Sequence, residues 1–438
     1  MSTGVPEVKG EMKMRKKRDC FDEIVGYEDI KRELRMISDM LNNPEAYRKL
    51  GAGLNEGVLL SGRPGTGKTT MANCLIRSTQ RTPYICRKKT ADGSFVQEIT
   101  ETFARARENA PSIILLDDLD KFSDLDVGRD AEEFVTVQSC IDECRGTDVF
   151  VLATVNNIRK IPNSLLRAGR LGKQIHVRLP RRDETVEIVR HFLKQSNVCG
   201  DVDVTSVAMM LNGETCATLE NVINNAAIKA AYRRQDEVNM QNIVDSCLDL
   251  IFEAPESSLR LSEETLRRVA YHESAHAVIS EILDPGSVSI VSIRKPDGEG
   301  YGFVRYVRSD ERDDIDVMYN ENIIKTSLAG KAASEIVFGE TDLGVNADLH
   351  NAFKRAGYLV DNTCMYGFQN WIEDENSDFV GENRNRAMAM VMERNYLEVK
   401  RLLAANRELL DRMAAELLRK TTLLYADVQR ICHGIGEN

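Results

Sequence analysis

Long apolar runs are missing from this sequence. In 438 residues no apolar stretch approaches the length of about 18 that a membrane-spanning helix needs, and the N-terminus has no apolar signal-peptide core. We therefore expect a cytoplasmic protein without a membrane span. Cysteine pairs at C-x-x-C spacing are also missing among the ten cysteines, which fits free thiols in a reducing compartment.

An excess of positive charge is missing as well. The formal net charge of −11 argues against a general nucleic-acid binder, and it disfavours a DNA-handling motor. A basic cluster does occur near the N-terminus, within residues 1–19, and comprises Lys13, Arg15, Lys16, Lys17 and Arg18. We interpret residues 1–19 as a solvated flexible tail, and the alternative is a weak contact with anionic lipid.

Histidine is scarce, with six residues, yet two of them flank a glutamate in His272-Glu273-Ser274-Ala275-His276. The surrounding run 267–283 has helical apolar spacing and ends at Asp-Pro-Gly. Residues four apart share one face of a helix, so both imidazoles can hold one metal ion. Glu273 lies about 100° further round and can act as the base on an attacking water. This pattern predicts one zinc ion per chain.

A third zinc ligand must come from elsewhere in the C-terminal part of the chain. The candidates are Asp348, Glu335 and His350. His350 stands two positions from Asp348 in a predicted helix, so it would face away from a site that contains Asp348. The residues alone leave the choice between Asp348 and Glu335 open.

A nucleotide site is predicted further upstream, where the apolar strand 57–61 runs into G-x-x-x-x-G-K-[ST]. In this motif glycines let backbone N–H groups wrap a phosphate, the lysine reaches the β- and γ-phosphates, and the threonine reaches Mg²⁺. The residues expected to bind ATP with Mg²⁺ are Gly62, Pro64, Gly65, Thr66, Gly67, Lys68 and Thr69.

Two more buried strands end in polar residues. The run 112–116 leads into Asp117 and Asp118, and the run 149–155 leads into Asn156. Ligands of open parallel sheets bind at the carboxyl ends of the strands, and Asp117 is placed to hold Mg²⁺. Strands that alternate with helices over residues 21–180 indicate a doubly wound α/β domain.

With these motifs in this order, the chain resembles the AAA+ ATPases, and over nearly all of residues 20–435 it resembles the FtsH family of ATP-dependent zinc metalloproteases. The resemblance implies that Asn156 is the sensor residue and that Arg170, in Leu165–Gln174, is the arginine finger. It also implies that Asp348 is the third zinc ligand. A finger that acts on the neighbouring subunit implies a ring, which in this family is a homohexamer.

The chain departs from the family pattern in the motor. Asp118 stands where the family has a glutamate that activates water, and Lys173 replaces a second arginine. The pore segment 85–97 is shortened and lacks the family's aromatic grip, with Phe95 as the only aromatic residue within it. The family's membrane spans are absent from the sequence. We expect slow ATP turnover and weak unfolding power.

Together these features predict an α/β AAA+ P-loop ATPase, a doubly wound parallel sheet with a small helical subdomain, followed by a mainly α-helical zinc metallopeptidase domain. The predicted boundaries are a tail (1–19), a large ATPase subdomain (20–180), a small helical subdomain (181–252), a linker (253–262) and a peptidase domain (263–438). The predicted function is ATP-dependent zinc endopeptidase activity on unfolded or loosely folded polypeptides, in a ring. The alternative is an AAA+ remodelling or adaptor ATPase with weakened translocation and a residual or regulatory peptidase site.

Overall fold

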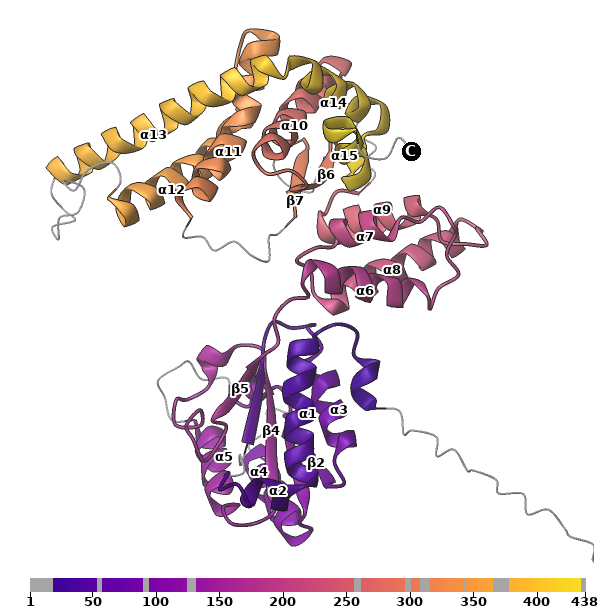
Figure 1. Ribbon diagram of the computed structural model, residues 1–438, viewed down its shortest axis with the longest axis vertical. Coiled ribbons are helices and arrows are strands. Elements are labelled where there is room, and N and C mark those ends of the chain that lie inside the picture. Colours follow the sequence, from indigo (N-terminus) through magenta and orange to yellow (C-terminus); the bar gives the residue numbers. More distant parts are fainter. Residues whose placement is uncertain are drawn as a thin grey trace, which may run out of the picture. The chain divides into compact units, whose positions relative to one another are not determined.

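The computed structural model describes residues 19–52, 57–89, 94–123, 131–255, 261–295, 301–307, 316–341, 343–364 and 378–434. The chain divides into two units, Met1–Leu179 and Pro180–Asn438 (Figure 1). The helical region expected over 181–252 and the peptidase region expected from 263 therefore fall in the same unit. The basic cluster near the N-terminus lies outside the described residues. None of the described helices is long and apolar enough to cross a membrane.

A five-stranded parallel sheet forms the centre of the first unit, with strand order β2-β3-β4-β1-β5. The strands are β1 (Gly57–Ser61), β2 (Thr82–Cys86), β3 (Ser112–Leu116), β4 (Val149–Val155) and β5 (Lys173–His176). The three central strands are buried along their whole length, as continuous apolar runs predict for a sheet that is covered on both faces. The predicted doubly wound sheet is confirmed.

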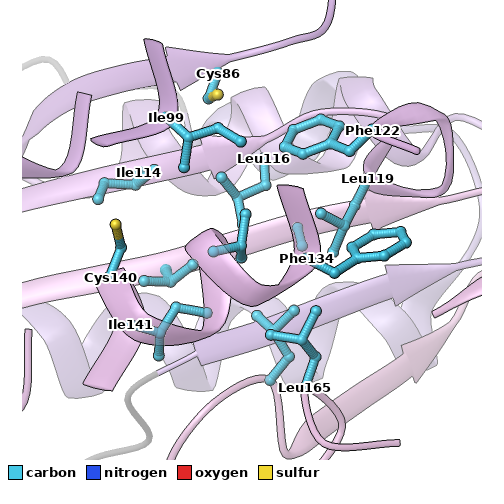
Figure 2. Packing of buried hydrophobic residues seen from close by; sticks show 14 of the residues in the cluster. Cys86, Ile99, Ile114, Leu116, Leu119, Phe122, Phe134, Cys140, Ile141 and Leu165 are labelled. Atoms are coloured by element: carbon cyan, nitrogen blue, oxygen red, sulfur yellow. The ribbon is translucent and has the colours of Figure 1, made fainter. Parts of the chain in front are cut away.

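Helices cover the two faces of this sheet, with α1 and α3 on one face and α4 and α5 on the other (Figure 1). The helices of this unit are α1 (Glu28–Asn42), α2 (Pro44–Arg48), α3 (Lys68–Ser78), α4 (Phe95–Glu108) and α5 (Glu132–Glu143), with short 3-10 turns at Cys20–Glu23, Leu119–Lys121 and Ile158–Lys160. Figure 2 shows the core between the sheet and α4 and α5, where Ile99, Leu116 and Ile141 pack together. Because all the strands are parallel, the residues that follow β1, β3 and β4 meet at one edge of the sheet.

The second unit is mainly helical. It begins with α6 (Arg182–Leu193), α7 (Val204–Met210), α8 (Cys216–Tyr232) and α9 (Met240–Ile251). It continues with α10 (Glu263–Leu283), α11 (Val317–Phe338), α12 (Asn346–Thr363), α13 (Asp378–Ala405), α14 (Arg407–Lys420) and α15 (Tyr425–His433). A small antiparallel sheet, ordered β7-β6-β8, is formed by β6 (Val288–Ser292), β7 (Phe303–Tyr306) and β8 (Thr422–Leu424). The turn expected at 295–298 lies largely outside the described residues.

Helix α10 packs against α11, α13, α14, β6 and β7, the later elements of this unit. Ser262 caps its N-terminus by accepting a hydrogen bond from the backbone N–H of Thr265, and acidic residues occupy the first turn. The helix packs most extensively against α11. Fully buried alanines lie on both helices, including Ala270 and Ala277 on α10 and Ala329 on α11. Their small side chains let the two helix backbones approach closely, which brings the polar face of α10 next to α11.

Candidate zinc and nucleotide sites

Three metal-ligating side chains from two helices meet in the second unit. His272 and His276 lie one turn apart on α10, and Asp348 lies in the first turn of α12. Asp348 Oδ2 is 3.1 Å from Nε2 of His272 and 3.3 Å from Nε2 of His276. The two Nε2 atoms are 3.0 Å apart, so all three ligand atoms converge on one small volume. Two imidazoles and one carboxylate fit zinc and leave a coordination position for water.

Contacts with α11 fix the orientation of both imidazoles. Nδ1 of His276 lies 2.7 Å from the backbone carbonyl oxygen of Thr326. Because a carbonyl oxygen can only accept a hydrogen bond, Nδ1 carries a proton, so Nε2 is the nitrogen that can ligate the metal. The ring of His272 lies directly against Gly330, where an added Cβ would be 2.3 Å from Cε1 and 2.6 Å from Nε2 of the imidazole. Glycine at 330 therefore provides the space that the His272 ring fills.

The other two candidate ligands lie outside this cluster. His350 is exposed on α12. Glu335, on α11, forms ion pairs with Lys331 and Lys400. Burial raises the pKa of Glu335, but its hydrogen bonds with Lys331, Tyr396 and Lys400 outweigh this effect and lower the value to about 2. Glu335 is thus committed to a separate network of ion pairs.

Asp348 is strongly stabilised as a carboxylate. Burial raises its pKa, but hydrogen bonds with His272 and His276 hold the pKa well below its usual range. Its place in the first turn of α12 adds the favourable field of a helix N-terminus. A carboxyl group must be deprotonated to ligate a metal ion, so these contacts prepare Asp348 for that state before any metal binds.

Glu273 lies beside the cluster and is nearly buried. Burial raises the pKa of its carboxyl group, and the two neighbouring histidines act in the opposite direction. A carboxyl group with a raised pKa is suited to accept and return a proton near neutral pH. A Cβ at Gly302 would lie 2.8 Å from Cγ and 2.9 Å from Oε1 of Glu273, so glycine at 302 leaves room for this carboxylate.

The metal cluster and Glu273 line one cleft with a volume of about 770 Å³. Apolar side chains contribute much of its wall, including Val269, Leu283, Val304 and Ile323. A cleft of this size has room for a short peptide segment, with polar groups confined to a few positions.

The phosphate-binding motif adopts the conformation that its glycines predict. Gly65 and Gly67 have φ values of 78° and 93°, and Gly67 directly precedes α3. Lys68 Nζ donates hydrogen bonds to the carbonyl oxygens of Gly62 (2.9 Å) and Arg63 (2.8 Å) and to Oδ1 of Asn156 (2.8 Å). The lysine is thus held over the loop whose phosphate it is expected to bind.

The polar residues that follow β3 and β4 lie beside Lys68 and Thr69 of the phosphate-binding motif. Asp117 Oδ1 accepts a hydrogen bond from Thr69 Oγ1 at 3.2 Å, so the two oxygen ligands expected for Mg²⁺ are adjacent. Asn156 links Lys68 to Asp118, since its Nδ2 donates to Asp118 Oδ1 at 3.0 Å. The structure brings together all the predicted residues of this site that follow β1, β3 and β4.

Comparisons with known proteins find family matches for both parts of the chain. Residues 58–179 match the model of the ATPase family associated with various cellular activities (AAA), and residues 259–431 match peptidase family M41. The ATP-dependent zinc metalloprotease FtsH of Thermobaculum terrenum is 32% identical over 96% of this chain and 69% of its own length. The chain belongs to the FtsH family of ATP-dependent zinc metalloproteases. FtsH 2 of Symbiobacterium thermophilum is 31% identical over 94% of this chain and 74% of its own length.

Membership of the FtsH family establishes the enzyme class and the cofactors. The chain is an ATP-dependent zinc metalloprotease that uses Zn²⁺ and ATP with Mg²⁺. The nitrogen and oxygen ligands on α10 and α12 fit the zinc ion, and the oxygens of Thr69 and Asp117 fit the magnesium ion.

The residues that differ from the FtsH pattern are all engaged within the chain. Asp118 forms an ion pair with Lys121 at 2.8 Å. Lys173, at the start of β5, forms an ion pair with Glu33 of α1 at 2.7 Å. Phe95 is buried at the start of α4, with its ring edge-on to Phe122 at 4.8 Å. Its ring is therefore a core contact of the first unit.

Arg170 is also held by its own subunit. Its Nε and Nη2 donate to the two carboxylate oxygens of Asp142 at 3.0 and 2.7 Å, and Nη1 donates to the carbonyl oxygen of Ser164 at 2.6 Å. The hydrogen bonds with Asp142 raise the pKa of the guanidinium further, so its charge is secure. An arginine that acts on a neighbouring subunit would have to exchange or share these partners.

Sequence reasoning missed several residues that shape the sites. Gly330, Gly302 and the carbonyl of Thr326 act only through tertiary contacts, and no motif marks them. Asp120 was also missed, although its carboxylate accepts the backbone N–H groups of Asn156 and Asn157 and so positions the end of β4. Its place two residues after Asp118, next to the same strand end, was the one signal available.

Proposed function

We propose that this FtsH family member is an endopeptidase that assembles into a homohexameric ring and degrades unfolded or loosely folded polypeptides at the expense of ATP. The strongest support is the cluster of His272, His276 and Asp348, with the buried carboxylate of Glu273 beside it in a peptide-sized cleft. An assembled ligand set of this kind is expected of a working peptidase site rather than of a decayed one.

In this proposal His272, His276 and Asp348 hold the zinc ion, and Glu273 is the catalytic base. When bound, zinc supplies a Lewis acid that polarises the peptide carbonyl and activates water. Glu273 accepts a proton from the attacking water and returns it to the leaving nitrogen. Thr326 keeps His276 in the tautomer that ligates, and the wall of the cleft positions the peptide.

The nucleotide site is assigned in the same way. Gly62–Thr69 wraps the phosphates, Lys68 reaches the β- and γ-phosphates, and Thr69 and Asp117 hold Mg²⁺. Asp118 orients the attacking water, and Asn156 senses the γ-phosphate. The remaining members of the phosphate-binding set are Pro64, Gly65, Thr66 and Gly67.

Arg170 acts in the ring as the finger that reaches the nucleotide of the neighbouring subunit. Asp142 and a phosphate are both anions that can accept two hydrogen bonds from one guanidinium. If Arg170 leaves Asp142 to bind the phosphate of the neighbouring subunit, ring assembly becomes coupled to ATP binding. The preference for loosely folded substrates follows from the buried position of Phe95, which leaves no aromatic side chain for gripping in the described pore residues. We retain 20–180, 181–252 and 263–438 as the functional regions of the ring subunit.

The experiment measures zinc content and cleavage of an unfolded protein such as casein with ATP, with ADP and without nucleotide. The unmodified chain should hold about one zinc ion and cleave casein fastest with ATP. Glu273→Gln should keep zinc and nucleotide binding but lose cleavage, since an amide cannot accept the proton. Asp348→Ala should lose zinc, whereas the matched change His350→Ala on the same helix should not.

A zinc-loaded protein that hydrolyses ATP but cleaves no polypeptide would support the alternative function, a remodelling ATPase or adaptor. Retention of cleavage by Glu273→Gln would show that another group is the base. The molecular mass of the assembly, measured in the presence of ATP, tests the homohexameric ring. A protein that stays monomeric at all concentrations would contradict the ring.

A further inference from the structure

Both acidic residues that follow β3 carry a cationic partner from the same chain. Asp117 is nearly buried, and one of its oxygens, Oδ1, accepts hydrogen bonds from Thr69 (3.2 Å) and Thr154 (2.7 Å). The other oxygen, Oδ2, forms an ion pair with Nη2 of Arg87. Asp118 is paired with Lys121. A nucleotide site of this type is expected to keep the Asp117 carboxylate for a metal ion, so its engagement by an arginine requires an explanation.

The position of Arg87 follows from the pairing of β2 with β3. In this parallel pair Cys86 lies opposite Leu116, and the N–H of Asp117 donates to the carbonyl oxygen of Cys86 at 3.0 Å. The next residue of each strand, Arg87 and Asp117, therefore leaves the sheet at the same edge. The register of the sheet places this guanidinium at the magnesium side of the site, and the side chain of Arg87 is about half exposed.

The electrostatic consequence concerns nucleotide that arrives without Mg²⁺. The phosphates of ATP and ADP are multiply charged, and a bare Asp117 carboxylate would repel them across a few ångströms. The guanidinium of Arg87 neutralises that carboxylate, as a metal ion would. Arg87 also competes with Mg²⁺, because both are cations that bind the Asp117 carboxylate.

We propose that Arg87 is an internal counter-ion at the magnesium position, which lets nucleotide bind with little dependence on Mg²⁺ and which Mg²⁺ must displace. The proposal rests on the assignment of Gly62–Thr69 as the nucleotide site. It predicts that removal of the guanidinium disfavours metal-free nucleotide and favours Mg²⁺. Binding of metal-free nucleotide becomes weaker, and the Mg²⁺ concentration that supports binding of metal–nucleotide becomes lower.

The test is a titration of the full chain with fluorescent ADP, in excess chelator and over a range of Mg²⁺ concentrations, and it needs no turnover. In the unmodified protein the dissociation constants with and without Mg²⁺ should differ by less than about tenfold. Arg87→Ala should weaken binding in chelator on the order of tenfold, leave binding at saturating Mg²⁺ unchanged, and lower the half-saturating Mg²⁺ concentration. Arg87→Lys, which keeps the charge, should restore most of the metal-free binding.

Arg107→Ala is the control, because Arg107 also forms an arginine–carboxylate ion pair in the first unit, with Glu143 at 2.6 Å near the C-terminus of α4. This helix leads into β3 from the edge of the sheet opposite the phosphate site, so this variant should behave like the unmodified protein. Equal weakening by Arg87→Ala with and without Mg²⁺ would overturn the proposal, and so would no change under either condition. Lys68→Ala separates the two assignments, because retention of ADP binding by that variant would refute the nucleotide site itself.

Discussion

Replacing Gly330 by alanine should damage the zinc site although it replaces no metal ligand. The added Cβ would lie 2.3 Å from Cε1, 2.5 Å from Nδ1 and 2.6 Å from Nε2 of His272. Carbon atoms in good contact lie about 3.5–4.0 Å apart, so the imidazole must move by about 1 Å or more. Gly330 lies within the buried interface of α11 with α10, so the helix backbone has little freedom to yield.

The magnitude follows from the tolerance of metal sites. Ligands must be held within about 0.5 Å of their working geometry, and changes that disturb the support of a ligand typically cost 10–100-fold in metal affinity. We expect Gly330→Ala to weaken zinc binding by about 100-fold, which corresponds to about 2.7 kcal/mol. The substitution should not weaken helix α11 itself, since alanine stabilises a helix by about 1 kcal/mol relative to glycine.

The assay is a competition titration against a zinc chelator, with metal content measured after dialysis. Gly381→Ala is the matched control, because Gly381 lies in helix α13 and a Cβ there meets nothing within 4 Å. That variant should retain zinc and gain slightly in thermal stability. If Gly330→Ala binds zinc as tightly as the unmodified protein, the imidazole is not fixed by this contact and the reasoning fails.

The remaining predictions concern the two catalytic carboxylates. Gly302→Ala would place a Cβ 2.8 Å from Cγ of Glu273 and should lower peptide cleavage about 100-fold, measured as kcat, while zinc content stays at one per chain; loss of zinc would contradict this. Burial raises the pKa of Asp118, but its ion pair with Lys121 reverses the shift and keeps the carboxylate a weak base. Lys121→Ala should therefore speed steady-state ATP turnover by roughly two- to tenfold. Asp118→Glu should also speed turnover, because the longer side chain brings the carboxylate closer to the attacking water. Slower turnover in both variants would show that the site has adapted to the Asp118–Lys121 ion pair.

Much of the fold was predictable because its signals are local. Each buried strand of the ATPase sheet is a continuous apolar run, and the phosphate-binding loop, Asp117, Asp118 and Asn156 each come directly after such a strand. The two histidines are on one helix, so their convergence is fixed by helical periodicity alone. The third ligand is different, because Asp348 comes from another helix, and only the resemblance to a known family selected it over Glu335.

The contacts that tune these sites could not be predicted from the sequence. Gly330 and Gly302 matter because of the distance between two backbones, and that distance depends on how whole helices and strands pack. Arg87 follows β2, which two strands separate from β1 in the sheet order, and its contact with Asp117 needs the register of β2 with β3. A sequence shows which side chains are available, but the register decides which of them become partners.

The two sites also differ in the groups that pair with their carboxylates. Around the zinc cluster the described partners of Asp348 are the two imidazoles, which a metal ion can engage together with it, so the site is ready to exchange protons for zinc. In the ATPase site Asp117 and Asp118 are paired with Arg87 and Lys121, so magnesium and the attacking water must each compete with a cation of the chain. Degradation by this enzyme should therefore be limited by ATP turnover rather than by peptide hydrolysis. On this argument a short peptide that enters the cleft without translocation is cleaved at a rate independent of Lys121, whereas cleavage of a long unfolded chain follows the rate of ATP turnover.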